Sequence, residues 1–191
     1  MSVFLYKQLD LPKIPRHLVE QYTQVVNYSE ETVGSPLTFG YSNPFRWDKG
    51  VNISFQNYQV STELNQWLKE NVTASAKAYS VFYTYATDNT YPTDLIPHID
   101  SFRQYPVIYN LDIGGDNPVT RFYQYKDYPL EHKNGLSLKS YDGLTEIDSF
   151  VGPMESWYLI NAHVVHSVGP LTSPRIGIHL SLPDGHEFIP Q

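Results

Sequence analysis

The amino-acid sequence predicts a mainly β protein, with a jelly-roll core and N-terminal helices packed on one face. Short runs rich in aromatic and β-branched residues recur through the second half of the chain, as is typical of strands. Clusters of Gly, Pro, Asn and Asp separate these runs and mark turns. Two helical patterns come before most of them. Short strands with frequent turns form sandwiches or barrels, and the preceding helices can cover one sheet.

Two segments in the first half of the chain have helical patterns. Residues 15–26 begin with a proline, which is favoured at an early helical position. Residues 62–78 carry four apolar residues at helical spacing: Leu64, Trp67, Leu68 and Val72. Ser61 or Thr62 is suited to cap the start of this second helix, because a hydroxyl can accept a hydrogen bond from the first turn.

Five segments are expected to be strands: residues 79–86, 105–113, 119–126, 157–161 and 175–182. The turn cluster at residues 114–118 lies between the second and third of these strands. We therefore expect these two strands to form a hairpin. Asn-Gly and Asp-Gly pairs mark two further turns, at residues 134–135 and 142–143.

The composition is that of a folded chain of 191 residues. Hydrophobic residues make up 41% and charged residues 17%, which excludes intrinsic disorder. No apolar run reaches the ~18 residues of a membrane span, and no linker or repeat divides the chain. We expect a single domain over residues 1–191, with helical or irregular support in 1–78 and the jelly-roll core in 79–183.

The net charge is −7 and no basic cluster stands out, so neither nucleic acid nor a membrane is an expected partner. The chain has no cysteine, which excludes disulfides, thiol nucleophiles and thiolate zinc sites. Any metal site must therefore use histidine and carboxylate ligands. The start of the sequence lacks the long apolar region of a signal peptide, and we expect a cytoplasmic protein.

An H-x-D triplet gives the first candidate metal ligands. His98 and Asp100 are two residues apart, so on an extended segment both side chains point to the same side. A nitrogen and an oxygen donor on adjacent corners suit ferrous iron. By itself the triplet is equally compatible with a surface turn that carries a solvated aspartate.

The last predicted strand has an alternating pattern that adds a cation. Arg175, Gly177, His179 and Ser181 share one face, and aliphatic residues fill the other. The polar face is either a solvent face or the lining of a barrel mouth. In a barrel mouth Arg175 would need an anionic partner, and its planar guanidinium suits a carboxylate. Gly177 would leave room for such a ligand beside the strand.

These elements together resemble the Fe(II)- and 2-oxoglutarate-dependent oxygenases. The motifs are PHID at 97–100, HSV at 166–168 and PRIGIHLSL at 174–182, with the arginine nine residues after the distal histidine. The stretch LINAHVVHSVGPLTSPRIGIHL is also similar to the distal strand pair of the aspartyl/asparaginyl β-hydroxylase and proline hydroxylase branch. The resemblance covers roughly residues 79–183.

The resemblance implies a double-stranded β-helix, which is a jelly-roll, and a defined set of site residues. His98, Asp100 and His166 would ligate Fe(II), and Arg175 would bind the C5 carboxylate of 2-oxoglutarate. The implied reaction uses O2 to hydroxylate a C–H bond. The substrate suggested by this branch is an amino-acid residue in a protein or peptide, or an amino-acid-like small molecule.

Other residues are secondary candidates in the resemblance. His163 competes with His166, but the H-S-V motif favours His166, and His163 is expected to lie in a turn. Gly177 stands where many members have Ser or His that helps to bind the carboxylate. His179, Ser181 or a tyrosine of the strand before the triplet, Tyr83 or Tyr85, would then help; for the tyrosines a place in the core is the alternative.

Arg103 and Asn110 resemble an H-x-D-x-x-R pattern that is followed by a strand containing Asn. Arg103 would orient Asp100 or meet a substrate carboxylate, unless it forms a surface ion pair. Trp157 is expected in the core. Three histidines have no partner pattern and are expected at the surface: His17, His132 and His186.

Two other functions stay open at this point. A cupin-like metal enzyme without 2-oxoglutarate would usually use three histidines and a carboxylate, and would not need an arginine after the last histidine. A non-catalytic jelly-roll module for binding or structure would carry the three metal-type residues by coincidence. Arg175 separates these alternatives, because only the oxygenase requires a cation in the barrel mouth.

Overall fold

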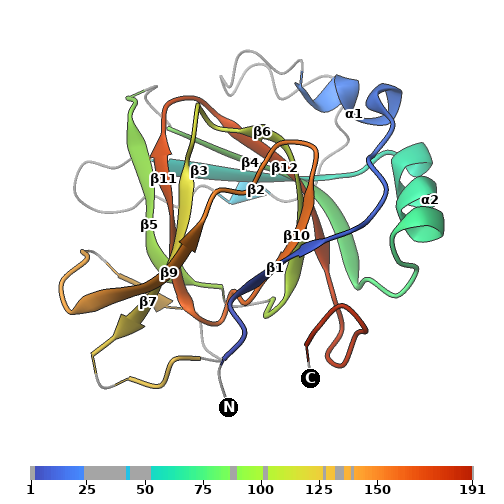
Figure 1. Ribbon diagram of the computed structural model, residues 1–191. Helices are drawn as coiled ribbons and strands as arrows, with labels where there is room; N and C mark the ends of the chain where they lie inside the picture. The colour runs from blue at the N-terminus through green and yellow to red at the C-terminus, as the bar shows by residue number, and fades with distance from the viewer. Residues whose placement is uncertain are drawn as a thin grey trace.

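A computed structural model describes residues 3–23, 42–43, 53–86, 90–100, 103–126, 128–131, 136–138 and 140–190. The described chain forms two antiparallel sheets that face each other, with two helices outside one of them (Figure 1). This arrangement is the predicted jelly-roll with N-terminal helices on one face. Neither described helix has the length and apolar character that a membrane span requires.

The larger sheet has seven strands in the order β1-β10-β6-β12-β4-β3-β2. Their bounds are β1 Tyr6–Leu9, β10 Trp157–Ile160, β6 Pro106–Ile113, β12 Arg175–Ser181, β4 Ala78–Ala86, β3 Ile53–Gln59 and β2 Ser42–Asn43. The smaller sheet has five strands in the order β8-β5-β11-β7-β9. Their bounds are β8 Leu136–Ser137, β5 Thr93–Ile99, β11 Val165–Leu171, β7 Val119–Tyr125 and β9 Leu144–Phe150.

The helices are α1, Arg16–Thr23, and α2, Thr62–Asn71. Of the two predicted candidates, Ser61 is the N-cap of α2, and it accepts a hydrogen bond from the backbone N–H of Leu64 at 3.2 Å. The helix ends at Asn71, before the predicted end at residue 78, and residues 72–77 form an irregular connection to β4. Residues 24–26 of the first predicted helix lie outside the described residues.

The main hydrophobic core lies between the two helices and the outer face of the seven-stranded sheet. Leu64 and Leu68 of α2 are fully buried there. Every second residue of β12 joins them, namely Ile176, Ile178 and Leu180. Figure 1 shows both helices on this side of the sheet. The other face of β12 therefore points into the space between the two sheets.

The predicted hairpin of residues 105–113 and 119–126 is wrong. β6 belongs to the larger sheet and β7 to the smaller one, so the intervening turn carries the chain between sheets. Gly114 and Gly115 have φ values of 85° and 131°, which only glycine adopts easily. The backbone N–H groups of Thr172 and Ser173 donate to the carbonyl of Gly114 at 2.7 and 3.2 Å. The β6–β7 and β11–β12 crossovers are therefore bonded to each other.

The expectation that His186 is a surface residue is also wrong. His186 is buried near the C-terminus, where its Nε2 lies 3.0 Å from Thr73 Oγ1. The backbone N–H of Phe188 donates to its Nδ1 at 3.1 Å. These bonds attach the C-terminal segment to the end of α2. His17 is exposed as expected, and His132 lies outside the described residues.

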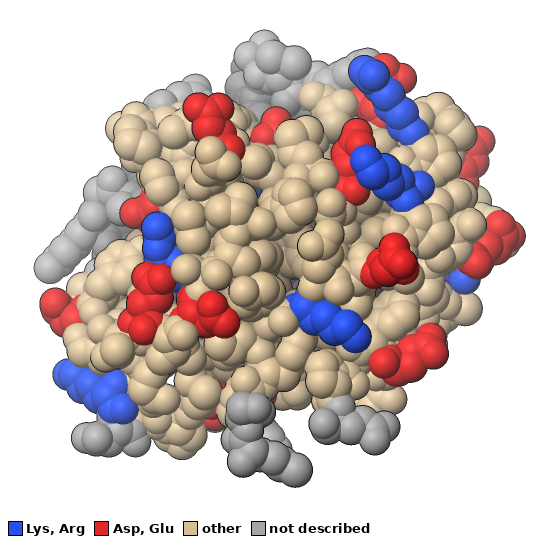
Figure 2. All heavy atoms as spheres, in the orientation of Figure 1, with Lys and Arg blue, Asp and Glu red and all other residues tan. Residues whose placement is uncertain are grey.

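Charged side chains are dispersed over the face of the molecule shown in Figure 2. Lysines and arginines lie singly there among aspartates and glutamates, and they form no basic patch on that face. The described surface ion pairs are of this isolated kind, such as Lys13 with Glu155 at 3.0 Å. Exposed pairs of this type contribute little to stability.

Truncation of the core beneath α2 tests the assigned packing. Leu64→Ala removes a fully buried side chain and should lower the free energy of unfolding by about 3 kcal/mol, because it leaves a cavity. Ile147→Ala on β9 is a matched control, since that side chain is 42% exposed, and it should change the unfolding free energy by less than about 1 kcal/mol. Urea unfolding measures both. Equal losses would contradict the assigned core.

Candidate metal centre

Three candidate ligands meet between the sheets. His98 is the penultimate residue of β5, and it lies directly opposite His166 of the neighbouring strand β11. Asp100 follows β5, and its backbone N–H donates to the carbonyl of Ala162 at 2.9 Å. One ligand atom from each of the three residues lies within 4.8 Å of the other two. The triplet and the distal histidine, 66 or more residues apart in sequence, thus form one group.

Backbone hydrogen bonds orient both imidazoles. His98 Nδ1 lies 2.8 Å from the carbonyl of Ile96, and His166 Nδ1 lies 2.9 Å from the carbonyl of Val164. A carbonyl only accepts, so each Nδ1 carries the proton and donates it. The lone pair of each ring is then on Nε2, which is the arrangement that a metal-binding histidine needs.

Burial keeps these histidines neutral. Burial, reinforced by the neighbouring His98, lowers the pKa of His166 to about 3. Burial also lowers the pKa of His98, although Asp100 acts in the opposite direction. Neutral imidazole is the form that binds a metal ion. The pair is therefore ready to act as nitrogen ligands at neutral pH.

Asp100 is an ionised carboxylate in this group. Burial alone would raise its pKa, but the Arg103 guanidinium, His166 and His98 together lower it below its ordinary value. Its Oδ1 lies 3.7 Å from His98 Nε2, and its Oδ2 accepts a hydrogen bond from Arg103 Nε at 2.6 Å. Two imidazole nitrogens and one carboxylate oxygen are the donor set that suits ferrous iron.

Arg175 lies on the interior face of β12 with two polar neighbours. Its guanidinium donates to the hydroxyl of Tyr158 at 2.6 Å and to Asn110 Oδ1 at 3.4 Å. Tyr158 donates in turn to Asn110 Oδ1 at 2.9 Å. Both partners are neutral, and no described carboxylate lies within ion-pair distance of Arg175. This cation can therefore take an external carboxylate.

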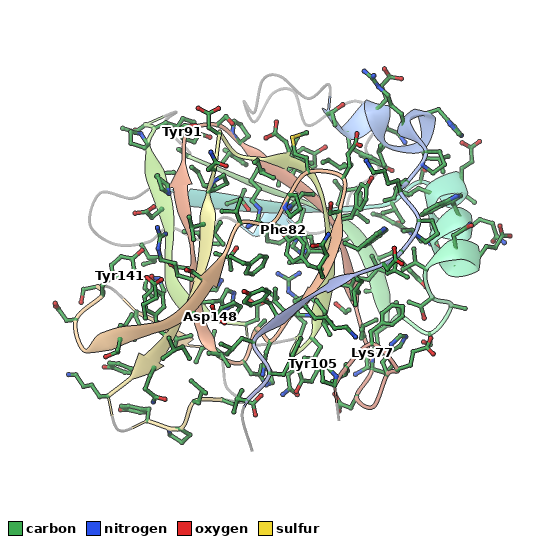
Figure 3. The ribbon with its side chains drawn as sticks, viewed as in Figure 1. Lys77, Phe82, Tyr91, Tyr105, Tyr141 and Asp148 are labelled. Atoms are coloured by element: carbon green, nitrogen blue, oxygen red, sulfur yellow. The ribbon has the colours of Figure 1, made fainter. Side chains whose placement is uncertain are left out.

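A second contact joins the metal-type group to β12. Arg103 donates from one terminal nitrogen to His179 Nδ1, and its guanidinium lies 5.3 Å from the ring centre of Phe82. Phe82 is labelled near the centre of the view in Figure 3. Burial, Arg103 and Arg175, in that order, keep the pKa of His179 well below its ordinary value. Arg175 and His179 share the face of β12 opposite the core residues, and Arg103 contacts His179, so both cations lie in the same interior.

The structure places some of the secondary candidates in the interior between the sheets and others in the main core. Asn110, Arg103 and His179 lie in this interior, where Arg103 contacts His179 and Asn110 contacts Arg175. Tyr83 does not, because it lies on the opposite face of β4 and its hydroxyl donates to the carbonyl of Tyr22 at 2.7 Å in the main core. The expectation that Tyr83 helps to bind 2-oxoglutarate is therefore not supported.

Other residues are placed as follows. Tyr85 shares the core position of Tyr83, and Trp157 is buried in the same core as expected. His163 lies in the turn before β11 and is not part of the three-residue group. His166 is the second residue of β11. Ser181 is the last residue of β12, and its carbonyl accepts from the Lys77 N–H at 2.8 Å.

Sequence reasoning missed Tyr158 and Phe82 as site residues. The alternation in β10 could have found Tyr158, because it follows the core residue Trp157 and so faces the other side of the sheet. The same argument applies to Phe82, which precedes the core residue Tyr83 and lies opposite Gly177. Alternation divides an aromatic strand into two faces, but the sequence does not say which face packs on the core until one residue of the strand has been placed.

The neutral state of His166 makes the metal-free protein sensitive to acid. The unfolded chain protonates this histidine near its ordinary pKa of 6.5, whereas the folded chain does so only near 3. Stability from this group is therefore complete above pH 6.5 and is lost as the pH falls. Between about pH 7.5 and about pH 5.5, the unfolding free energy should fall by about 1 kcal/mol through His166.

Urea unfolding in the presence of a chelator measures this dependence. His166→Asn keeps a neutral polar side chain but removes the titrating group, so its unfolding free energy should decline less over the same pH interval. An unchanged decline in the variant would show that His166 is not held neutral in the fold.

The fold is similar to that of known enzymes. The chain is similar to a Pseudomonas putida prolyl-4-hydroxylase, with a TM-score of 0.51, 13% identity and 94% of each chain covered. It is also similar to SnoN, the non-haem α-ketoglutarate-dependent epimerase of nogalamycin biosynthesis, with a TM-score of 0.49, 13% identity, and 97% of this chain and 84% of that chain covered. No protein-family model and no curated protein match the chain. The protein thus has a jelly-roll fold that is similar to the fold of this prolyl-4-hydroxylase.

Proposed function

We propose that this protein is a non-haem Fe(II)- and 2-oxoglutarate-dependent dioxygenase that hydroxylates a C–H bond. In this proposal residues 1–191 form one oxygenase domain, with the jelly-roll core over 79–183. The observation that carries the proposal is a pairing of two features. Neutral His98 and His166 converge with ionised Asp100, and Arg175 lies in the same interior with only neutral described partners.

Both cofactor positions fit the residues that are present. His98, Asp100 and His166 would hold Fe(II) from one side and leave other positions open. The Arg175 guanidinium, with the hydroxyl of Tyr158 beside it, would hold the C5 carboxylate of 2-oxoglutarate. When bound, Fe(II) and 2-oxoglutarate supply the oxidising chemistry, in which O2 hydroxylates the substrate while 2-oxoglutarate becomes succinate and CO2.

The protein contributes orientation and exclusion of water. Phe122, Phe150 and Tyr158 form a series of ring contacts between His166 and Arg175, with centroid distances from 5.2 to 6.3 Å. Phe122 is fully buried and lies opposite His166 on β7. This aromatic wall would separate the metal and the keto acid from solvent on one side. A dry, preorganised site strengthens the charge interactions that position the cosubstrate.

The substrate class follows from the resemblance of the distal strand pair. The proposal is an amino-acid residue in a peptide or protein, or an amino-acid-like small molecule. The name of the prolyl-4-hydroxylase with a similar fold indicates a prolyl substrate, which is compatible with this class. Fold similarity by itself does not determine the substrate.

Loss of the carboxylate ligand is the first test. Anaerobic Fe(II) and 2-oxoglutarate should give the purified protein a weak visible charge-transfer band. Asp100→Ala should abolish this band, because the site then lacks its only anionic ligand. Near-UV circular dichroism serves as the control for folding. Metal retention without a band in the wild-type protein would favour a cupin-like enzyme, and no metal retention would favour a binding or structural module.

Removal of the interior cation tests the cosubstrate assignment. Arg175→Met should weaken 2-oxoglutarate binding by roughly 10–100-fold, because the C5 carboxylate loses a charged hydrogen-bond donor. Fe(II) affinity should change little. Arg175→Lys keeps the charge and should lose less. Titration of the charge-transfer band with 2-oxoglutarate measures these affinities, and an unchanged affinity in Arg175→Met would rule out this role.

A further inference from the structure

The two oxygens of Asp100 have different surroundings. Oδ1 lies 3.7 Å from His98 Nε2 and therefore faces the histidine pair. Oδ2 accepts a hydrogen bond from Arg103 Nε at 2.6 Å. A strong charge-assisted bond of this length fixes both the position and the rotation of the carboxylate. Only one of the two oxygens is therefore directed at the candidate metal position.

Arg103 is itself held from the opposite sheet. One of its terminal nitrogens donates to Nδ1 of His179 on β12, while Asp100 belongs to the segment after β5. The guanidinium also lies 5.3 Å from the centre of the Phe82 ring. Phe82 and His179 stack with ring centroids 4.8 Å apart. The Arg103 guanidinium is thus hydrogen-bonded to both Asp100 and His179 and packs against the Phe82 ring.

The neighbouring glycine contributes to this arrangement. A Cβ on Gly177 would lie 3.1 Å from His179 Nε2 and 3.4 Å from the carbonyl of Tyr109. Glycine at this position therefore leaves the space that the His179 ring occupies. The imidazole that accepts from Arg103 therefore lies in the space beside Gly177 that the sequence pattern had suggested for a ligand.

We propose that Arg103, held by His179 and Phe82, is a positioning residue that makes Asp100 bind the metal through Oδ1 alone. This inference rests on the proposed function, because it assigns Asp100 as a metal ligand. A carboxylate that bound through both oxygens would occupy a coordination position that the cosubstrate or O2 needs. Arg103 occupies Oδ2 and thereby keeps that position open.

The first test is Co(II) binding by the full-length metal-free protein, followed through the visible bands of Co(II), which report ligand geometry. Arg103→Met should raise the dissociation constant for Co(II) by roughly 10–100-fold and change the band pattern. Arg121→Met is the matched control. Arg121 lies on the same sheet but pairs with Glu146 at 3.6 Å, on the face opposite His166, so Co(II) binding should stay at the wild-type level.

Two milder variants cover the case in which Arg103→Met does not fold. Arg103→Lys keeps the charge, but its single ammonium group cannot reproduce the fork that joins Asp100 to His179. His179→Phe keeps a ring against Phe82 but removes the nitrogen acceptor. Both should weaken Co(II) binding and shift the bands, less strongly than Arg103→Met. Wild-type affinity and spectra in the folded Arg103 variants would overturn the proposal.

A second readout separates this role from that of Arg175. In the Co(II)-saturated protein, Arg103→Met should reduce 2-oxoglutarate affinity much less than Arg175→Met does, because Arg103 acts on the metal ligand. Equal losses in the two variants would assign Arg103 to the cosubstrate and overturn the positioning role. If the wild-type protein bound no Co(II), the proposed function would fail and this inference with it. If the wild-type protein bound Co(II) and the Arg103 variants bound it equally well, only this inference would be wrong.

Discussion

The two-residue period of the strands is the constraint on which the rest of this structure depends. Strands β4, β6, β10 and β12 of the seven-stranded sheet present one face to the core beneath the helices and the other to the interior between the sheets. In β12, Ile176, Ile178 and Leu180 join the core, so Arg175, Gly177 and His179 must face inward. The apolar packing beneath α1 and α2 thereby fixes the position of the polar groups. A register shift by one residue would bury the cation beneath the helices instead.

Buried charge imposes a second condition on this interior. Asp100 is ionised there, and it is paired with Arg103 and surrounded by neutral imidazoles. Arg175 has no carboxylate within ion-pair distance among the described residues, only the neutral Tyr158 and Asn110. An unpaired cation in a largely buried place is costly unless a ligand supplies the anion. The position of Arg175 is therefore better explained by an anion-binding site than by a structural core.

Hydrogen bonds connect the two sheets close to the candidate site. The crossover at Gly114 is hydrogen-bonded to the crossover after β11, which leads directly to Arg175. Across the interior, Arg103 connects Asp100 to His179 of the other sheet. The metal-type residues and the cosubstrate-type residues come from different sheets, so these links set their separation. Small movements of one sheet relative to the other would alter the site, because its geometry depends on both.

The sequence by itself determined the strand alternation and limited the helix cap to Ser61 or Thr62, and its motifs indicated the three residues that come together as a metal-type group. These features depend on local periodicity and on residue chemistry, which are written in short segments. The sequence did not determine that residues 105–113 and 119–126 enter different sheets, because a glycine-rich turn serves a hairpin and a crossover equally well. It did not select Tyr158 and Phe82 over Tyr83 either. Which face of an aromatic strand meets the helices, and which neighbours an arginine finds across the interior, are decided by packing between distant segments, and only the tertiary structure contains that information.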